Sequence, residues 1–114
     1  MRAWVPAEFF TAAVTREVVD EMAAVVRDFH PAGFRLMARS LAEADTTDLL
    51  PCINVPTLLL WGDGDRRSPL DIAAAFEAAI PRATLRVIAN AGHVSNMERP
   101  QEFTALVRRF ARSN

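Results

Sequence analysis

Val55-Pro56-Thr57-Leu58-Leu59-Leu60-Trp61, followed directly by Gly62-Asp63-Gly64-Asp65, is the stretch that decides the fold class of this chain. A short, nearly continuous apolar run closed by a glycine- and aspartate-rich turn is typical of a strand buried on both faces of a parallel sheet. We therefore predict a strand over residues 55–61 with a polar loop at its carboxyl end.

A second strand of the same type is predicted over residues 84–89, and Asn90-Ala91-Gly92-His93 closes it. The segment between the two strands begins with residues that are typical of a helix start. We expect Ser68 to cap this helix, Pro69 to take its first position and Asp71 to complete a capping box. The apolar stripe of the helix consists of Ile72, Phe76, Ala79 and Ile80.

The first 48 residues are predicted to be all-helical. Residues 16–29 carry apolar side chains at three- and four-residue steps, which predicts an amphipathic helix. His30-Pro31-Ala32-Gly33 is expected to break it, because the residue before a proline disfavours the helical region and glycine tolerates a turn. A second helix is predicted over residues 34–44, and the last helix of the chain is predicted to start at Pro100.

From Pro51 onward the predicted order is strand, helix, strand, helix. This alternation indicates an α/β fold with a parallel sheet covered by helices. Two parallel strands do not form a stable sheet alone, because doubly buried strands need neighbours on both edges. We therefore expect the two strands to belong to a larger sheet.

Polar side chains follow both predicted strands. Asp63 and Asp65 come after the first, and His93 comes after the second. The carboxyl ends of parallel strands meet at one edge of a sheet, so a carboxylate and an imidazole are expected side by side. An acid in that position fixes the tautomer of the histidine, which can then remove a proton from a nucleophile.

Several motifs combine in order: residues 55–69, then Ile80-Pro81-Arg82-Ala83, then Ala91-Gly92-His93 through Glu98-Arg99-Pro100-Gln101-Glu102-Phe103. Together they closely resemble the end of the α/β-hydrolase family. In that family the seventh strand ends in a glycine, the catalytic acid sits three residues after it, and a proline follows four residues later. The eighth strand ends in a Gly-His pair whose histidine is catalytic.

This resemblance, which covers about residues 51–110, implies that Asp65 is the acid and His93 the base of a catalytic triad. It implies a fold made of the carboxyl-terminal part of an α/β-hydrolase core over residues 49–114. Residues 1–48 resemble the end of the helical lid that many members insert before the seventh strand. Val94 and Ser95 are expected to line a substrate pocket beside the base.

The nucleophile of the family sits in a Gly-x-Ser-x-Gly elbow, and this sequence contains no such elbow. The serines, at positions 40, 68, 95 and 113, all lack glycines two residues away on each side. Cys52 lies in Pro51-Cys52-Ile53, again without an elbow. We therefore expect this chain to be inactive alone, lacking both the nucleophile and the oxyanion donors.

Several single residues fit simpler roles than catalysis. Asp63 directly follows Gly62 and fits a turn role better than the role of the acid. His30 is expected to be structural. Trp4, Phe9 and Phe10 are expected to be exposed in the absence of the rest of a lid.

Composition excludes several other functions. The 114 residues carry a formal net charge of -1, with 13 basic and 14 acidic residues interspersed, so neither nucleic acid nor a membrane surface is an expected partner. No apolar run approaches the ~20 residues that span a bilayer, and no signal peptide is apparent, so a cytoplasmic location is expected. One cysteine and two histidines predict neither a disulfide nor a metal site, and the resemblance implies no cofactor.

Three functional hypotheses remain open from the sequence. The first is a partial hydrolase whose lineage cleaves an ester or similar small apolar substrate. The second is a non-enzymatic fragment or interaction module, and the third is one half of a split hydrolase completed by another chain. Self-association, or pairing with a chain that supplies the rest of the sheet, is expected in each case. Which substrate is cleaved does not follow from the sequence.

Overall fold

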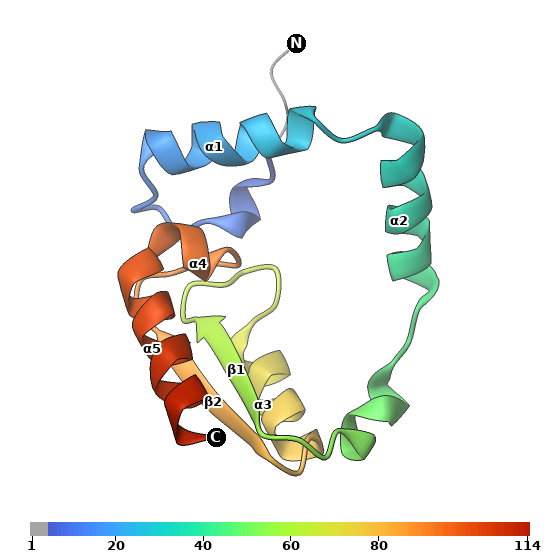
Figure 1. Ribbon diagram of the computed structural model, residues 1–114. Coiled ribbons are helices and arrows are strands. Elements are labelled where there is room, and N and C mark those ends of the chain that lie inside the picture. Colours follow the sequence, from blue (N-terminus) through green and yellow to red (C-terminus); the bar gives the residue numbers. More distant parts are fainter. Residues whose placement is uncertain (1–4) are drawn as a thin grey trace.

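The computed structural model describes residues 5–114 and contains a two-stranded parallel sheet (Figure 1). Strands β1 (Thr57–Gly62) and β2 (Ala83–Ile88) pair in parallel, from Thr57 opposite Ala83 to Gly62 opposite Ile88. This confirms the predicted adjacent parallel strands. β1 begins two residues later than predicted, and β2 begins one residue earlier.

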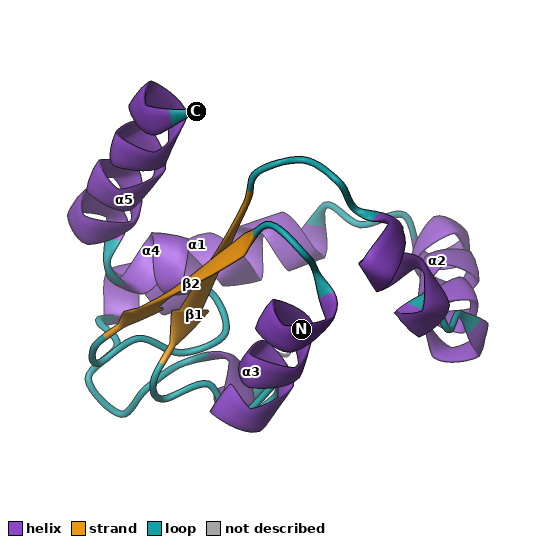
Figure 2. Cartoon of the chain, turned by 90° about the horizontal axis from the view of Figure 1, so that it is seen from below, coloured by secondary structure: helices purple, strands orange, loops and turns teal. Residues whose placement is uncertain are grey.

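Two helices cover the sheet on opposite faces (Figure 2). Helix α3 (Leu70–Ala79) connects the two strands, and α5 (Pro100–Ser113) starts at Pro100 as predicted. The short helix α4 (Ser95–Glu98) precedes α5. The most buried apolar residues of the described chain are Phe10, Ala73, Ile80, Ile88 and Ala91. Most of this small core therefore lies between α3, the sheet and the loop after β2.

The predicted capping box of α3 is wrong. The residue before the helix is Pro69, with ψ of 164°, and no side chain caps the helix. The backbone of Ser68 is already engaged: its N–H donates to Asp65 Oδ1 at 2.8 Å and its carbonyl accepts Trp61 Nε1–H at 2.6 Å. The tight loop after β1 thus holds Ser68 one position too early to cap.

The amino-terminal part is helical, as predicted, with different boundaries. It contains the 3₁₀ turn η1 (Ala7–Phe9), helices α1 (Arg16–Arg27) and α2 (Pro31–Glu43), and the 3₁₀ segment η2 (Thr47–Cys52). α1 ends two residues early, because Asp28 and Phe29 make tighter i to i-3 bonds.

The predicted break between the two helices is shorter than expected. α2 begins at Pro31, with proline at its first position, and Gly33 lies inside the helix instead of ending a turn. The N–H of Phe34 donates to His30 O at 2.9 Å, so His30 is the residue that starts the helix.

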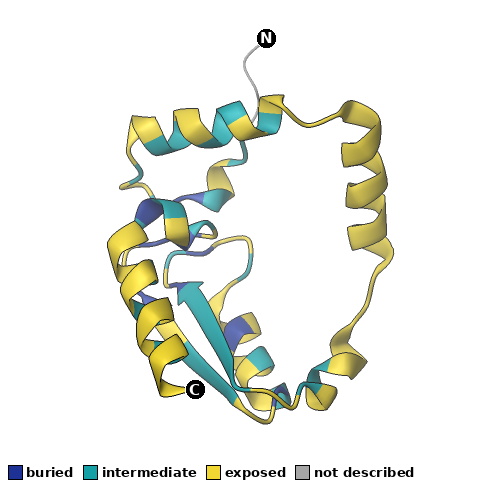
Figure 3. Ribbon diagram, viewed as in Figure 1, coloured by how far each residue is buried: buried dark blue, intermediate teal, exposed yellow. Residues whose placement is uncertain are grey.

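α1 and α2 form an arc that stands away from the sheet (Figure 1), and every residue of α2 is exposed (Figure 3). The accessible surface is 8318 Å², against about 6,200 Å² for a compact monomer of this mass. The radius of gyration is 15.7 Å, against about 13 Å for a compact chain of this length. The described chain is therefore more open than a self-sufficient domain.

Among the helices of residues 5–114, none is both long enough and apolar enough to cross a bilayer.

Candidate active site

The loops after the two strands bring Asp65 and His93 into direct contact. His93 Nδ1 lies 2.9 Å from Asp65 Oδ2, which confirms the predicted proximity. The Asp65 side chain is 5% exposed, whereas the His93 side chain is 35% exposed. A buried acid therefore holds an imidazole whose ring remains accessible from outside the chain.

Asp65 is fixed by hydrogen bonds within its own loop. Its N–H donates to the carbonyl of Gly62 at 3.2 Å. Its Oδ1 accepts the backbone N–H groups of Arg67 and Ser68 at 3.0 and 2.8 Å. One carboxylate oxygen thus closes the turn while the other faces His93, so the turn role and the site role belong to the same residue.

Asp63, the competing acid, joins the two loops instead of facing the histidine. Its Oδ1 accepts the N–H of Asn90 at 2.8 Å. Asn90 adopts a positive φ of 53°, which asparagine tolerates better than most residues. The N–H of Gly64 donates to Ala91 O at 2.9 Å, which extends the pairing of the strands into the loops. The turn role expected for Asp63 is therefore filled by Asp65, and Asp63 bridges the two loops instead.

His93 is also held from the amino-terminal side. Its N–H donates to the carbonyl of Phe9 at 2.9 Å, and the Phe9 ring stacks on the imidazole with centroids 5.4 Å apart. The guanidinium of Arg67 lies 5.2 Å from the centroid of the Phe9 ring. Phe9 is half-buried and Phe10 is only 4% exposed, so the expectation that both are exposed is wrong; Trp4 lies outside the described residues. The segment before α1 folds onto the histidine loop, where Phe9 stacks on His93, and Phe10 lines a cavity with Val14 and Val19.

The pair has the arrangement of a general base with its orienting acid. An ionised carboxylate only accepts hydrogen bonds, so the Asp65–His93 contact requires the proton on Nδ1 and leaves Nε2 of a neutral ring as the acceptor. Within residues 5–114, the contact with Asp65 is the one side-chain hydrogen bond that His93 makes. Within the described residues, Nε2 of His93 thus makes no hydrogen bond.

Val94 and Ser95 follow the histidine directly, but neither makes a side-chain hydrogen bond to it. Val94 is half-buried, and its N–H points to Phe9 O at 3.4 Å. Ser95 is 6% exposed in the first position of α4, and its carbonyl accepts the N–H of Arg99 at 2.8 Å. Neither residue lines the apolar cavity beside α1.

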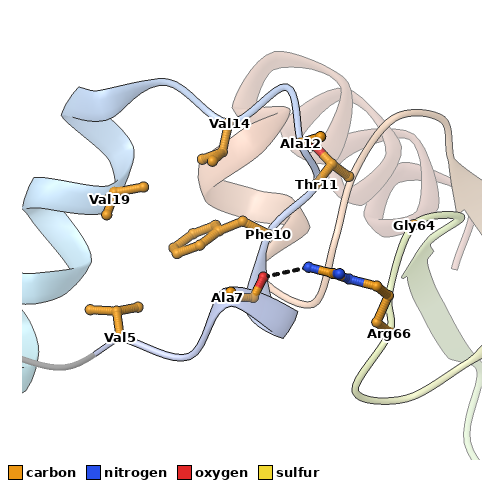
Figure 4. A pocket seen from close by; sticks show the side chains of 9 residues that line it. All are labelled: Val5, Ala7, Phe10, Thr11, Ala12, Val14, Val19, Gly64 and Arg66. Atoms are coloured by element: carbon orange, nitrogen blue, oxygen red, sulfur yellow. Dashed lines mark hydrogen bonds between the residues drawn. The ribbon is translucent and has the colours of Figure 1, made fainter.

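That cavity, of about 660 Å³, lies between α1 and the segment before it (Figure 4). Its lining is mainly apolar and includes Phe10, Val14 and Val19, with Gly64 and Arg66 from the Asp65 loop. Arg66 donates to the carbonyl of Ala7 at 2.8 Å across its edge. His93 does not line this cavity, so the cavity and the acid–base pair are neighbours and not one site.

Glu98 is a buried residue near His93 that was not predicted as a site residue from the sequence. It is 9% exposed and accepts three hydrogen bonds, from the N–H of Gly92 and from the N–H and hydroxyl of Thr11. These partners lie 6 and 87 positions away in the sequence. No local pattern marks such a residue, since its partners come from different elements.

Other titratable groups are distant from this chemistry in the chain. The pKa of Glu17, at the start of α1, is lowered by its own backbone N–H and by the Thr15 hydroxyl. The pKa of Asp45, after α2, is lowered by the hydroxyl and backbone N–H of Thr47. Across residues 5–114, no three His, Cys, Asp or Glu side chains gather closely enough to hold a metal ion.

Comparison with known proteins identifies the family. A family model described as the alpha/beta hydrolase fold matches residues 23–100, more than half of the chain. The chain belongs to the α/β-hydrolase family. Its two parallel strands and flanking helices thus belong to the α/β-hydrolase fold, as the sequence predicted.

Relatives of this α/β-hydrolase chain include enzymes with different substrates. A 2-hydroxy-6-oxononadienedioate/2-hydroxy-6-oxononatrienedioate hydrolase from Pseudomonas is 36% identical over 67 residues, which are 59% of this chain and 24% of the relative. The 3-oxoadipate enol-lactonase 1 of Acinetobacter baylyi is 31% identical over 81 residues, which are 71% of this chain and 30% of the relative.

Among solved structures, a thermophilic esterase from Thermogutta terrifontis matches with a TM-score of 0.80 and 36% identity. The match covers 85% of this chain and 36% of the esterase. An esterase from Exiguobacterium antarcticum also matches with a TM-score of 0.80, at 27% identity, over 91% of this chain and 40% of the esterase. The α/β-hydrolase chain thus spans a quarter to two-fifths of the proteins it resembles.

Proposed function

We propose that this chain carries the acid and the base of a nucleophile–histidine–acid triad, with Asp65 as the acid and His93 as the base. The 2.9 Å contact between Nδ1 and Oδ2 carries the proposal. It is supported by the fixed Asp65 carboxylate, whose other oxygen accepts two backbone N–H groups. An acid held in this way keeps the imidazole in one tautomer and stabilises the imidazolium that forms during catalysis.

The nucleophile and the oxyanion donors would come from residues that this sequence does not contain. No Gly-x-Ser-x-Gly elbow occurs in it, and the chain alone is therefore proposed to be inactive. Residues 1–48 are proposed to be the end of a lid and residues 49–114 the end of the core. The exposed α2 and the small core support this division, because lid helices pack on parts of the fold that are missing here.

The reaction proposed for the completed protein is hydrolysis of an ester or a similar small apolar substrate, without a cofactor. Esterases and an enol-lactonase among the relatives support this reaction class. A second arrangement, in which another polypeptide supplies the elbow, is favoured by one observation. The helix α2 is exposed over its whole length, as expected of an element that packs against a partner.

A chimera tests the proposed roles. The matching segment of the Thermogutta terrifontis esterase is replaced by this chain, and hydrolysis of an activated aryl ester is measured. In an active chimera, Asp65→Asn should lower kcat by roughly 10⁴-fold and His93→Ala by roughly 10⁶-fold, the losses found when the acid or the base of such a triad is removed.

Two matched controls belong to the same experiment. His30→Ala removes the other histidine and Asp63→Asn the neighbouring acid, and each should change the rate by no more than about twofold, as for surface substitutions. Circular dichroism verifies that each variant is folded. A folded, active chimera that keeps its rate after His93→Ala would refute the assignment of His93 as the base.

A further inference from the structure

Glu98 is a buried carboxylate that the proposed triad does not use. It is the last residue of α4 and is 9% exposed. Within residues 5–114 no cation lies within ion-pairing distance of it, and its charge is balanced by hydrogen bonds alone. Oε2 accepts the N–H of Gly92 at 2.6 Å, and Oε1 accepts the N–H and the hydroxyl of Thr11 at 2.9 and 2.7 Å. Short hydrogen bonds to an ionised acceptor are the strong ones.

One carboxylate oxygen of Glu98, Oε2, binds Gly92, the residue before His93. Gly92 is fully surrounded, and a Cβ on it would meet Phe9 O at 2.6 Å and Glu98 Oε2 at 2.8 Å. Gly92 does not adopt a positive φ, so backbone freedom does not explain the glycine. The space does: the carboxylate of Glu98 and the carbonyl of Phe9 occupy the place of its side chain.

The other carboxylate oxygen, Oε1, binds the segment that contacts the imidazole. Thr11 lies two residues after Phe9, whose carbonyl accepts the N–H of His93 and whose ring stacks on the histidine. Glu98 therefore fixes both the loop that carries His93 and the segment that covers it. Without this carboxylate, Gly92 and Thr11 would have no shared anchor.

We propose that Glu98 is a positioning residue that sets the orientation of His93 by joining the Gly92–His93 loop to the Phe9–Thr11 segment. The proposal rests on the function proposed above, since it concerns the same histidine. Its consequence is that Nε2 of His93 keeps a fixed direction only while the segment before α1 is docked. Release of that segment frees the imidazole on the face that Phe9 covers.

Histidine-selective NMR of the full 114-residue chain tests this inference. The chain contains only His30 and His93, so labelled histidine gives two ring signals, and exposed His30 is an internal reference. In the wild type the Phe9 ring should displace the His93 ring signal from that of His30. Glu98→Gln replaces one carboxylate oxygen by an NH₂ group that cannot accept a hydrogen bond, so the side chain can accept from Gly92 or from Thr11 but no longer from both. The His93 signal should then move toward that of His30, with loss of the Nδ1–H signal.

The matched control is Glu102→Gln, an exposed carboxylate in the first turn of α5, which should leave the His93 signal unchanged. Thr11→Val removes only the hydroxyl donor and should cause a smaller shift in the same direction. If Glu98→Gln unfolds the chain, the His93 signal of the Thr11→Val variant is the deciding measurement. A His93 signal that stays at its wild-type position in a folded Glu98→Gln variant, or in Thr11→Val when the former is unfolded, overturns the proposal. Because the readout is the ring and not ester hydrolysis, this failure is distinct from failure of the proposed triad.

Discussion

The carbonyl of Phe9 accepts the N–H of His93 at 2.9 Å, while the ring of the same residue stacks on the imidazole. A residue that precedes both amino-terminal helices thus forms part of the surroundings of the histidine. Aromatic pairs of this kind contribute about 0.5–1.5 kcal/mol beyond the area they bury. The orientation of His93 therefore depends on two distant parts of the sequence, the loop after β2 and the segment before α1.

The chain alone is expected to hydrolyse an activated short-chain aryl ester no faster than a matched concentration of free imidazole. It offers a base and an acid but no elbow, and each missing transition-state donor is worth about 3–4 kcal/mol of barrier. His93→Ala should therefore change the steady-state rate little. A large wild-type rate that disappears in His93→Ala would mean that a nucleophile is present after all, such as Ser95 or a group from a second subunit.

Asp65→Asn should reverse the tautomer of His93, because the N–H groups of Arg67 and Ser68 hold the amide oxygen and leave the amide NH₂ group facing Nδ1. Asp63→Asn is the matched change in the same loop. It keeps an oxygen for the N–H of Asn90 and should leave the histidine unaffected. Nitrogen-15 NMR of the imidazole measures both. An unchanged proton on Nδ1 in Asp65→Asn would contradict the role of Asp65 as the orienting acid.

Gly62→Ala should destabilise the chain by about 1–3 kcal/mol, the usual cost of overpacking. A Cβ at this position would overlap the backbone of Ala91, which belongs to the loop after β2 and cannot move without breaking the pairing. Gly33→Ala is the opposite case. A Cβ at this position would have His30 Cβ as its nearest neighbour, at 4.0 Å, and the substitution should stabilise helix α2 by up to about 1 kcal/mol. Denaturant midpoints and circular dichroism compare the two. If the two substitutions changed the stability equally, the loop after β2 would be able to shift and accommodate a Cβ at position 62.

Self-association is expected at micromolar concentrations, because α2 presents an apolar stripe at positions 34, 37 and 41. Leu41 is 70% and Met37 48% exposed. The double variant Met37→Glu/Leu41→Glu should lower the mass measured by light scattering. The control Arg35→Gln/Arg39→Gln changes the net charge by the same amount on the other side of the helix. It should leave the mass measured by light scattering unchanged. A compact wild-type monomer would contradict this prediction.

The sheet and the acid–base pair could be predicted because their signals are local. The apolar runs ending at Trp61 and Ile88, and the polar loops that follow them, are continuous in the sequence. Parallel pairing then brings Asp65 and His93 to one edge without further information. The motif spacing also selected Asp65 over Asp63, and the hydrogen bond of Asp63 to Asn90 agrees with that choice.

The remaining parts of the site depend on contacts that no local pattern encodes. Glu98 binds Thr11 across 87 positions, and Phe10 is buried in a segment whose side chains line a cavity with those of α1. The Ser68 cap failed for a local reason: Pro69 is the residue that precedes the helix, and Ser68 belongs to the turn that Asp65 closes. Gly33 did not end a helix because proline at the first position of α2 outweighed it.

The long reach between Thr11 and Glu98 has a consequence for how such a gene can evolve. Asp65 and His93 lie 28 positions apart in one strand–helix–strand unit, so recombination would usually transmit them together. The bond across 87 positions extends this inherited block upstream to Phe9 and Thr11. A crossover between α2 and β1 would join a histidine loop to a foreign covering segment, and would be tolerated only where both parents supply a donor for Glu98 and a ring for His93. Crossovers after Glu98, within α5, would leave every one of these contacts within a single parental sequence.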